Sequence, residues 1–117
     1  MIVDDSKAMR MIVRRTLKQA GFGSYEVEEA ASGADALTKI RQDAPLLVLS
    51  DWNMPDMSGY ELLTALREEN IGVPFAMITT EGTPEMRAKA ARAGALFLIQ
   101  KPFTPEELAR AVGTVLK

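Results

Sequence analysis

Short apolar runs alternate along this chain with longer stretches of helical periodicity. Four of the runs stand at positions 1–3, 46–49, 75–78 and 96–99, and each precedes a segment whose apolar residues recur at helical spacing. This alternation is typical of repeated strand–helix units, which form a parallel sheet covered by helices. The pattern predicts strands at 1–4, 25–30, 46–50, 74–79 and 96–100, and helices at 6–20, 33–42, 59–69, 84–93 and 105–116.

Capping residues mark the starts of the predicted helices. Ser58 and Thr104 each stand three positions before a glutamate, which is the pattern of a capping box. Proline follows Thr83 and Thr104 at the first helical position, where its missing N–H removes no helical hydrogen bond. Further cap candidates, for the first two helices, are Asp5, Ser6 and Ser32.

The first predicted helix is apolar on one face and basic on the others. We expect Gly21 and Gly23 to end it. Because charged residues on a helix usually face water, we interpret the basic side as a solvated surface. The basic residues are Lys7, Arg10, Arg14, Arg15 and Lys18.

The first two predicted strands differ from the others. The segment Val27–Ala30 is the most polar, which favours an edge position in the sheet. Only three apolar residues precede Asp4, fewer than the five or six of a typical strand. We therefore expect either a trimmed N-terminus or weak pairing at the first strand.

Polar residues follow four of the apolar runs at the point where each strand is predicted to end. In an open parallel sheet these ends share one edge, where such folds place their ligand sites. Asp4 and Asp5 meet Asp51 only if the first and third strands are neighbours, as in the flavodoxin-like order 2-1-3-4-5 with right-handed crossovers. The residues at the four ends are Asp4 and Asp5, Asp51, Thr79, and Lys101.

Composition narrows the possible functions. The length of 117 residues suits one domain. The 14 Lys and Arg against 16 Asp and Glu give a net charge of −2. Such a nearly neutral charge gives no sign of nonspecific nucleic-acid binding. With no cysteine and no histidine, disulfides, thiolate metal sites, histidine bases and the usual zinc ligands are excluded. No apolar run is long enough to span a membrane, so we expect a soluble cytoplasmic domain.

The predicted crevice has the chemistry of phosphoryl transfer. Two carboxylates 4 Å apart repel by about 4 kcal/mol at an effective dielectric near 20, so a cluster of three needs a compensating cation. Mg²⁺ suits such oxygen ligands. Asp51 could then be a carboxylate nucleophile, with Thr79 and Lys101 holding a phosphoryl group.

Each of these residues also has a purely structural interpretation. Asp4 and Asp5 could cap a helix, Asp51 could open a turn, and Lys101 could be an ordinary surface lysine. For any one of these residues taken alone, the structural interpretation is favoured over a functional one. Their joint occurrence at the ends of four strands favours a functional site. A flavin phosphate loop at Thr79–Thr83 is rejected, because it would follow the fourth strand and only seven aromatic residues are available.

Five segments stand in order along the whole chain: Val3–Ser6, Asp51–Gly59, Thr79–Glu81, Ala93–Ala95 and Lys101–Phe103. Together they resemble the receiver domain of two-component response regulators, most closely the single-domain chemotaxis regulators. The resemblance implies a flavodoxin-like (βα)₅ three-layer sandwich. It also implies a phosphoryl group accepted on Asp51 from a sensor histidine kinase or phosphotransfer domain, with Mg²⁺ as cofactor.

The resemblance also assigns roles to individual residues. Asp5 and Asp51 would bind Mg²⁺ directly, Asp4 largely through water, and Asn53 through its backbone carbonyl. Thr79 and Lys101 would hold the phosphoryl group, Asn53 and Glu81 would tune autodephosphorylation, and the Lys101–Pro102 bond would be cis. Helping backbone amides would come from Trp52, Asn53 and Thr80.

One position departs from the family pattern. The switch residue, usually Tyr or Phe, lies three positions before the lysine, and here it is Leu98. Phe97 precedes it, but strand alternation sends Phe97 and Leu98 to opposite faces. We therefore expect phosphorylation to be retained and its transmission to a partner to be altered.

The sequence thus predicts a signalling protein rather than an enzyme with a separate substrate. Phosphorylation would reorganise the surface of the fourth helix, fifth strand and fifth helix, and act through protein contacts because no effector domain follows Lys117. The expected state is a monomer or a weak activation-dependent dimer, with no nucleic-acid or membrane partner. A scaffold without phosphate control is the alternative; an aspartate phosphatase is disfavoured because its second aspartate would stand at Asn53.

Overall fold

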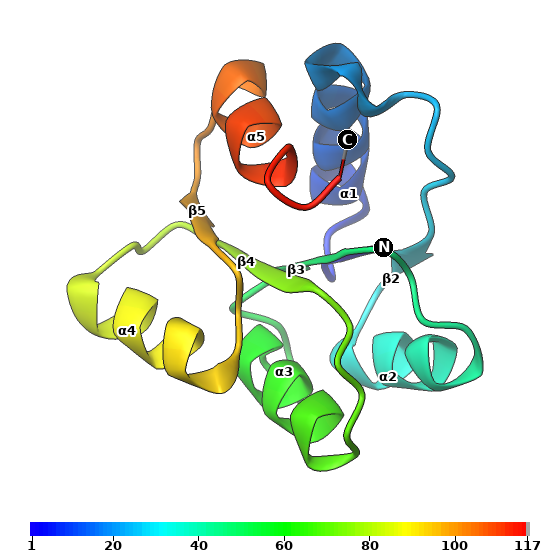
Figure 1. Ribbon diagram of the computed structural model, residues 1–117, viewed down its shortest axis with the longest axis vertical. Coiled ribbons are helices and arrows are strands. Elements are labelled where there is room, and N and C mark those ends of the chain that lie inside the picture. Colours follow the sequence, from blue (N-terminus) through cyan, green and yellow to red (C-terminus); the bar gives the residue numbers. More distant parts are fainter. Residues whose placement is uncertain (117) are drawn as a thin grey trace.

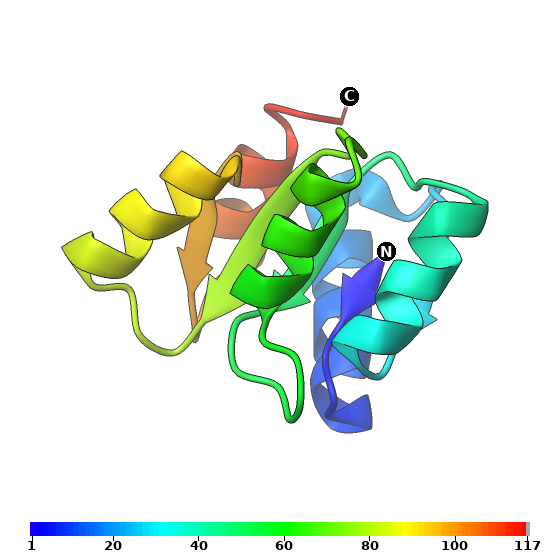
Figure 2. The ribbon, with the colours of Figure 1, turned by 90° about the horizontal axis from the view of Figure 1, so that it is seen from below.

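A parallel five-stranded sheet lies between two helical layers in the computed structural model, which describes residues 1–116 (Figure 1). The strand order is β2-β1-β3-β4-β5, as predicted. Helices α1 and α5 cover one face, and α2, α3 and α4 cover the other (Figures 1 and 2). The strands are β1 (Ile2–Val3), β2 (Glu29–Ala30), β3 (Val48–Asp51), β4 (Phe75–Thr79) and β5 (Leu98–Gln100). The helices are α1 (Lys7–Leu17), η1 (Lys18–Phe22), α2 (Gly33–Gln42), α3 (Gly59–Glu68), α4 (Pro84–Ala93) and α5 (Pro105–Val112).

The predicted helix caps are present. Ser58 and Thr104 form complete capping boxes with Glu61 and Glu107, and Thr83 accepts a hydrogen bond from the Met86 amide. These side chains satisfy amide groups that have no partner within the first helical turn. The first two helices are capped by Ser6 and Ser32.

Several element ends differ from the sequence prediction. The second strand was predicted over 25–30 but forms only at Glu29–Ala30, because it pairs with β1 alone and β1 offers only Ile2 and Val3. The last helix was predicted to reach 116 but ends at Val112. Gly113 follows it, and the Thr114 and Val115 amides bond three residues back in tighter turns.

The first helix also ends earlier than predicted. Its α-helical part stops at Leu17 and continues as one π-helical turn, η1. Gly21 within that turn has φ of 100°, in the left-handed region that favours glycine. Gly21 therefore turns the chain away from the helix, in the role the sequence assigned to it.

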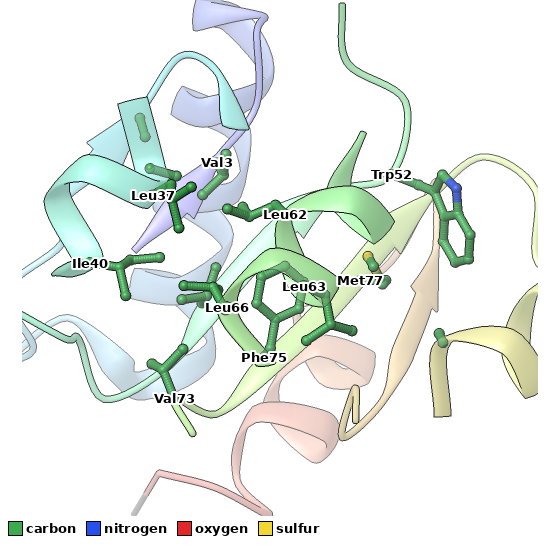
Figure 3. Close-up of a cluster of buried hydrophobic side chains, with 14 residues drawn as sticks. Val3, Leu37, Ile40, Trp52, Leu62, Leu63, Leu66, Val73, Phe75 and Met77 are labelled. Carbon is green, nitrogen blue, oxygen red and sulfur yellow. The ribbon is translucent and has the colours of Figure 1, made fainter. Parts of the chain in front are cut away.

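Side chains alternate between two cores along the strands. On one face Val3, Phe75 and Met77 pack against the leucines of α3 (Figure 3). On the other, Ile2 and Ile78 pack against α1 and α5. This alternation follows from the two-residue period of a strand, and it gives the sheet a core on each face. Because all the pairings are parallel, the carboxyl ends of the strands lie at one edge.

Part of the basic side of α1 is not the solvated surface that was predicted. Arg10 donates to Glu29 at 2.9 Å and to the Asp4 carbonyl at 2.7 Å. Arg14 donates to the Val27 carbonyl at 2.7 Å. These two residues tie α1 to β2, since a short edge strand leaves carbonyl and carboxylate groups within their reach.

Candidate functional site

The ends of four strands bring the predicted residues together. Val3 of β1 pairs with Ser50 of β3, so the residues that follow them, Asp4 and Asp51, are neighbours at the edge of the sheet. Thr79 ends β4, and Lys101 directly follows β5. The site therefore depends on the strand order rather than on any one loop.

Three carboxylates form a tight acidic cluster. One oxygen each of Asp4, Asp5 and Asp51 lies within 4.8 Å of the other two. Asp4 is buried, Asp51 is half-buried and Asp5 is exposed, so the cluster opens to solvent on the Asp5 side. The Asp4 side chain is fixed because its Oδ1 accepts the Ser6 amide at 2.9 Å.

The Lys101 ammonium completes the cluster. Its Nζ lies 3.2 Å from Asp51 Oδ1 and 3.7 Å from Asp4 Oδ2, and the Lys101 and Asp51 side chains are only 13% and 12% exposed. The Lys101 amide donates to the Thr79 carbonyl at 2.7 Å, which anchors the start of the loop after β5. The Lys101–Pro102 peptide bond is cis, as predicted.

The surroundings of Asp51 raise its pKa above the usual value of 3.8. Desolvation by burial is the largest cause, and the Asp4 and Asp5 charges act in the same direction. Lys101 opposes them through its charge and its hydrogen bond but does not cancel them. Additional positive charge at the cluster would therefore stabilise the Asp51 carboxylate.

The cluster fits a hard divalent cation. Its ligand atoms are carboxylate oxygens, two of the three side chains are at least half-buried, and one side is open to water. Mg²⁺ is bound in this way, through one or two carboxylates and several waters. Asn53 is exposed beside the cluster, and within residues 1–116 its carbonyl accepts no hydrogen bond.

The predicted phosphoryl contacts are partly available. Thr79 is fully buried and its Oγ1 accepts the Glu81 amide at 3.1 Å, which leaves the hydroxyl proton free to donate. The amides of Asn53 and Thr80 donate to no acceptor in the described part of the chain. The Trp52 amide was predicted to help but is occupied, because it donates to the Ile78 carbonyl at 3.0 Å and so extends the β3–β4 pairing.

The side chain of Trp52 is buried, although the residues on either side of it are polar. It is 9% exposed and belongs to the hydrophobic core on the α3–α4 side of the sheet (Figure 3). Its ring stacks on Tyr60 with 5.8 Å between centroids, and Lys89 Nζ lies 4.3 Å from the Tyr60 centroid. Burial of so large an apolar surface outweighs the polarity of the neighbouring Asp51 and Asn53.

Two residues that sequence reasoning missed position the site. Gly59, the first residue of α3, packs so closely on Asp51 that a Cβ would overlap the Asp51 carbonyl oxygen. Arg10 donates to the Asp4 carbonyl at 2.7 Å while its own position is fixed by Glu29. Neither role was readable from the sequence, since Gly59 reads as part of a cap and Arg10 as one of five similar basic residues.

The structure confirms that Phe97 and Leu98 face opposite sides of the sheet. Leu98 packs against the core under α3 and α4, and Phe97 against the core under α1 and α5. The Phe97 ring thus cannot occupy the switch position. Glu81 and Asn53, the two predicted modulators, are both exposed at the mouth of the site.

The sequence matches the model of the response regulator receiver domain over residues 1–113. This chain belongs to the response regulator receiver family. The chemotaxis protein CheY1 of Helicobacter pylori J99 is 40% identical to this receiver over 99% of the chain and 94% of its own length. The CheY homolog of Campylobacter jejuni is also 40% identical, over 99% and 90%.

Solved structures of other receivers and chemotaxis regulators are similar to this chain, in agreement with the family assignment. CheY4 of Vibrio cholerae superposes with a TM-score of 0.85 at 40% identity, covering 98% of this chain and 95% of that one. The receiver domain of a putative NarL from Mycobacterium tuberculosis gives 0.85 at 31% identity, over 97% and 90%. The chain is thus a two-component receiver domain of CheY type. Among residues 1–116, no helix is both long and apolar enough to cross a membrane.

Proposed function

We propose that this receiver accepts a phosphoryl group on the Asp51 carboxylate from the phosphohistidine of a sensor histidine kinase or phosphotransfer domain. The observation that carries the proposal is the placement of Lys101 Nζ 3.2 Å from Asp51 Oδ1, inside a cluster of three carboxylates. One ammonium beside three carboxylates leaves a negative site that would gain from a cation. It is an arrangement suited to aspartyl phosphate formation.

In the proposed transfer an Asp51 oxygen attacks phosphorus, and the P–N bond to the donor histidine breaks with its electron pair going to nitrogen. The Lys101 ammonium is close enough to Asp51 to contact an oxygen of the transferred phosphoryl group and offset its negative charge. The Thr79 hydroxyl and the free amides of Asn53 and Thr80 would donate to the other oxygens. Gly59 and Arg10 would hold Asp51 and Asp4 in place without touching phosphate.

Mg²⁺ is the proposed cofactor, held by Asp5 and Asp51, by Asp4 through water, and by the Asn53 carbonyl. When bound, it would neutralise the acidic cluster and the charge on the phosphoryl oxygens. The residues themselves supply the selectivity, since carboxylate and carbonyl oxygens with open water positions favour Mg²⁺ over softer metals.

The proposed output is a protein contact. Phosphorylation would reorganise the α4, β5 and α5 surface to control a partner protein, and exposed Asn53 and Glu81 would tune autodephosphorylation. Because Leu98 replaces the usual ring, we expect this output to differ from that of receivers with an aromatic residue there. The receiver would act as a signalling module rather than as an enzyme, and as a monomer or a weak activation-dependent dimer.

Fluorescence of Trp52 tests the phosphoacceptor role, because Trp52 directly follows Asp51 and is the only tryptophan. Mg²⁺ is titrated first and beryllofluoride, a phosphoryl mimic, second. We expect both additions to change the emission of the wild type. Asp51→Asn should lose the beryllofluoride response. Asp56→Asn should keep it, since Asp56 is an exposed carboxylate of the same loop.

A second readout removes the dependence on fluorescence. Incubation with acetyl phosphate and Mg²⁺ should add one acid-stable, base-labile phosphoryl group to the wild type and to Asp56→Asn, and none to Asp51→Asn. Equal labelling of wild type and Asp51→Asn would contradict the proposal. Absence of labelling and of any beryllofluoride response in a folded wild type would favour the scaffold alternative.

A further inference from the structure

The outer face of α1 carries unpaired positive charge. The helix and its continuation into η1 hold five basic residues and no acidic one. Arg10 and Arg14 are occupied by Glu29 and by backbone carbonyls. Within residues 1–116, Lys7, Arg15 and Lys18 form no ion pair and no hydrogen bond through their side chains. A receiver with a net charge of −2 thus concentrates free cations on one helix.

An exposed methionine lies among these cations. Met11 is 51% exposed, and its neighbour Ile12 is 47% exposed. Lys7, Arg15 and Lys18 stand four before, four after and seven after Met11, so helical spacing places them around it on one face. Exposure of a large apolar side chain inside a ring of charge is the usual make-up of a contact surface rather than of a solvated one.

A groove runs beside Met11 between α1 and the segment that leads to β2. It has a volume of about 470 Å³. The π-helical turn η1, with Gly21 at φ 100°, turns the chain from α1 toward β2, and residues on both sides of this turn line the groove. Its lining contains three cations and no carboxylate: Met11, Arg14, Arg15, Leu17, Lys18, Phe22, Gly23, Tyr25 and Val27.

The groove is separate from the acidic cluster. Helix α1 begins at Lys7, directly after Asp4 and Asp5, whereas the groove lies along its second half and η1. Occupation of the groove therefore requires no contact with Asp51. The inference does not rest on the proposed phosphoacceptor function.

We propose that the α1 groove, defined by Met11, Arg15, Lys18, Phe22 and Val27, binds an acidic segment of a partner protein that inserts one apolar side chain. The apolar floor of Phe22 and Val27 suits a single Leu or aromatic side chain. The free Arg15 and Lys18 on the rim suit carboxylates on either side of it. The cations on the rim thus select an acidic partner, and the apolar side chain that enters the groove determines which part of the partner segment binds there.

A protein segment fits these observations better than a lipid surface or a nucleic acid. A membrane would require a projecting apolar face, whereas the apolar residues here line a hollow. Of the two exposed apolar residues of α1, Met11 lines this hollow and only Ile12 lies outside it. A nucleic acid would use the cations but would leave the floor of the groove without a partner.

Selection from a random-peptide phage library tests the proposal. The library is panned against the receiver, with counter-selection by Arg15→Glu/Lys18→Glu. We expect enriched peptides in which Asp or Glu flank a Leu, Phe or Trp. In NMR titrations the synthetic peptides should shift the amides of Met11, Lys18, Phe22 and Val27, and not those of Asp51 or Lys101. At an ionic strength of about 1 M, where the Debye length is about 3 Å, binding should weaken.

The control variant is Arg92→Glu/Arg110→Glu, which makes the same charge change at two exposed cations on α4 and α5. Peptide affinity should fall at least about fivefold in Arg15→Glu/Lys18→Glu, as two exposed attractions become repulsions, and stay within twofold in the control. Mg²⁺ binding should be unchanged in both variants, which separates this test from that of the phosphoacceptor role.

Three outcomes would overturn the proposal. The first is enrichment of peptides without acidic residues, or of none that depend on Arg15 and Lys18. The second is binding of anionic phospholipid vesicles that Arg15→Glu/Lys18→Glu abolishes, which would assign the face to a membrane. The third is binding of single-stranded RNA that Arg15→Glu/Lys18→Glu abolishes, which would assign this face of α1 to a nucleic acid.

Discussion

At the residue scale, the ionised Asp51 carboxylate that the proposed function needs lowers the stability of the folded protein. Burial and two neighbouring carboxylates raise its pKa, so the folded protein holds the ionised form at a cost. A catalytic carboxylate usually carries such a cost, because its surroundings are arranged for a ligand that is absent in the resting state. Lys101 reduces the cost and at the same time stands ready for the phosphoryl group.

We predict that Asp51→Asn raises the free energy of unfolding at neutral pH. The folded-state pKa is raised above 3.8, so ionisation of Asp51 lowers stability above the folded pKa and costs nothing below 3.8, where both states are protonated. The gain should therefore shrink as the pH falls toward 4. Urea unfolding of both proteins across this range measures it. The matched control is Asp56→Asn, which makes the same change at an exposed residue of the loop after Asp51.

At the scale of elements, the junction of β3 and α3 determines where Asp51 lies. Gly59 starts α3 directly over the Asp51 carbonyl, and its amide donates to the Trp52 carbonyl at 2.8 Å. The loop between them can close only if that helical position lacks a side chain. A glycine in a first helical turn is therefore required here by a close approach of backbone rather than by a turn.

We predict that Gly59→Ala destabilises the receiver by about 1–3 kcal/mol, the usual cost of forcing an atom into packed structure. It should also weaken Mg²⁺ binding, because the Asp51 backbone must move. The matched control is Gly72→Ala, where a Cβ meets no atom within 4 Å. Thermal unfolding and Mg²⁺ titration of both variants provide the test, and equal effects at the two positions would contradict it.

A second contact between elements joins the Trp52 ring to α4. Trp52 stacks on Tyr60 of α3, and Lys89 of α4 lies over the Tyr60 ring. This stack lies on the α3–α4 side of the sheet, the side where Leu98 provides no aromatic ring. It is therefore a physical connection between the residue after Asp51 and helix α4.

We predict that Tyr60 and Lys89 stabilise each other by about 0.5–1 kcal/mol, the usual size of an exposed cation–π pair. A double-mutant cycle with Tyr60→Leu and Lys89→Gln, followed by urea unfolding, measures this coupling. Lys89→Gln should be nearly neutral once Tyr60 is replaced. A coupling energy of zero would show that the Lys89 position has no energetic consequence.

At the scale of the whole molecule, very few groups can make the free energy of unfolding depend on pH near neutrality. The chain has no histidine and no cysteine. The Met1 ammonium donates to the Leu47 carbonyl at 2.7 Å inside the fold, and burial lowers its pKa from 8.0 to about 6, while Glu28 acts in the opposite direction. The unfolded chain therefore binds a proton between pH 8 and pH 6 that the folded chain does not bind.

We predict that stability falls as the pH is lowered from 8 to 6, because the unfolded state binds more protons in this range. The loss over this range should be about 2 kcal/mol, most of the roughly 2.7 kcal/mol that a shift of two pKa units represents at about 1.4 kcal/mol per unit. Measurement in the Asp51→Asn background removes the opposite contribution of Asp51. A flat profile would contradict the prediction, and an N-terminal extension that moves the ammonium into solvent should abolish the dependence.

The sequence by itself determined the elements, their order and the chemistry of the site. Apolar runs, capping boxes and the residues at the four strand ends are local signals, and each reports a preference that short-range sterics and burial impose. Asp4, Asp5, Asp51 and Lys101 could thus be assigned before any distance was known. The flavodoxin-like strand order that brings them together follows from the requirement that the first and third strands be neighbours, and the resemblance to receivers implies the same fold.

Only the tertiary structure decided what depends on distant neighbours. The shortness of β2 follows from the two residues that β1 offers it, and the burial of Trp52 follows from its place in the core and its stacking on Tyr60. Arg10 donates a hydrogen bond to the Asp4 carbonyl, whereas the Arg15 side chain on the same helix lines a groove and has no such partner within residues 1–116. The sequence pattern does not show such differences, because similar residues on one helix differ only in the neighbours that tertiary packing places beside them.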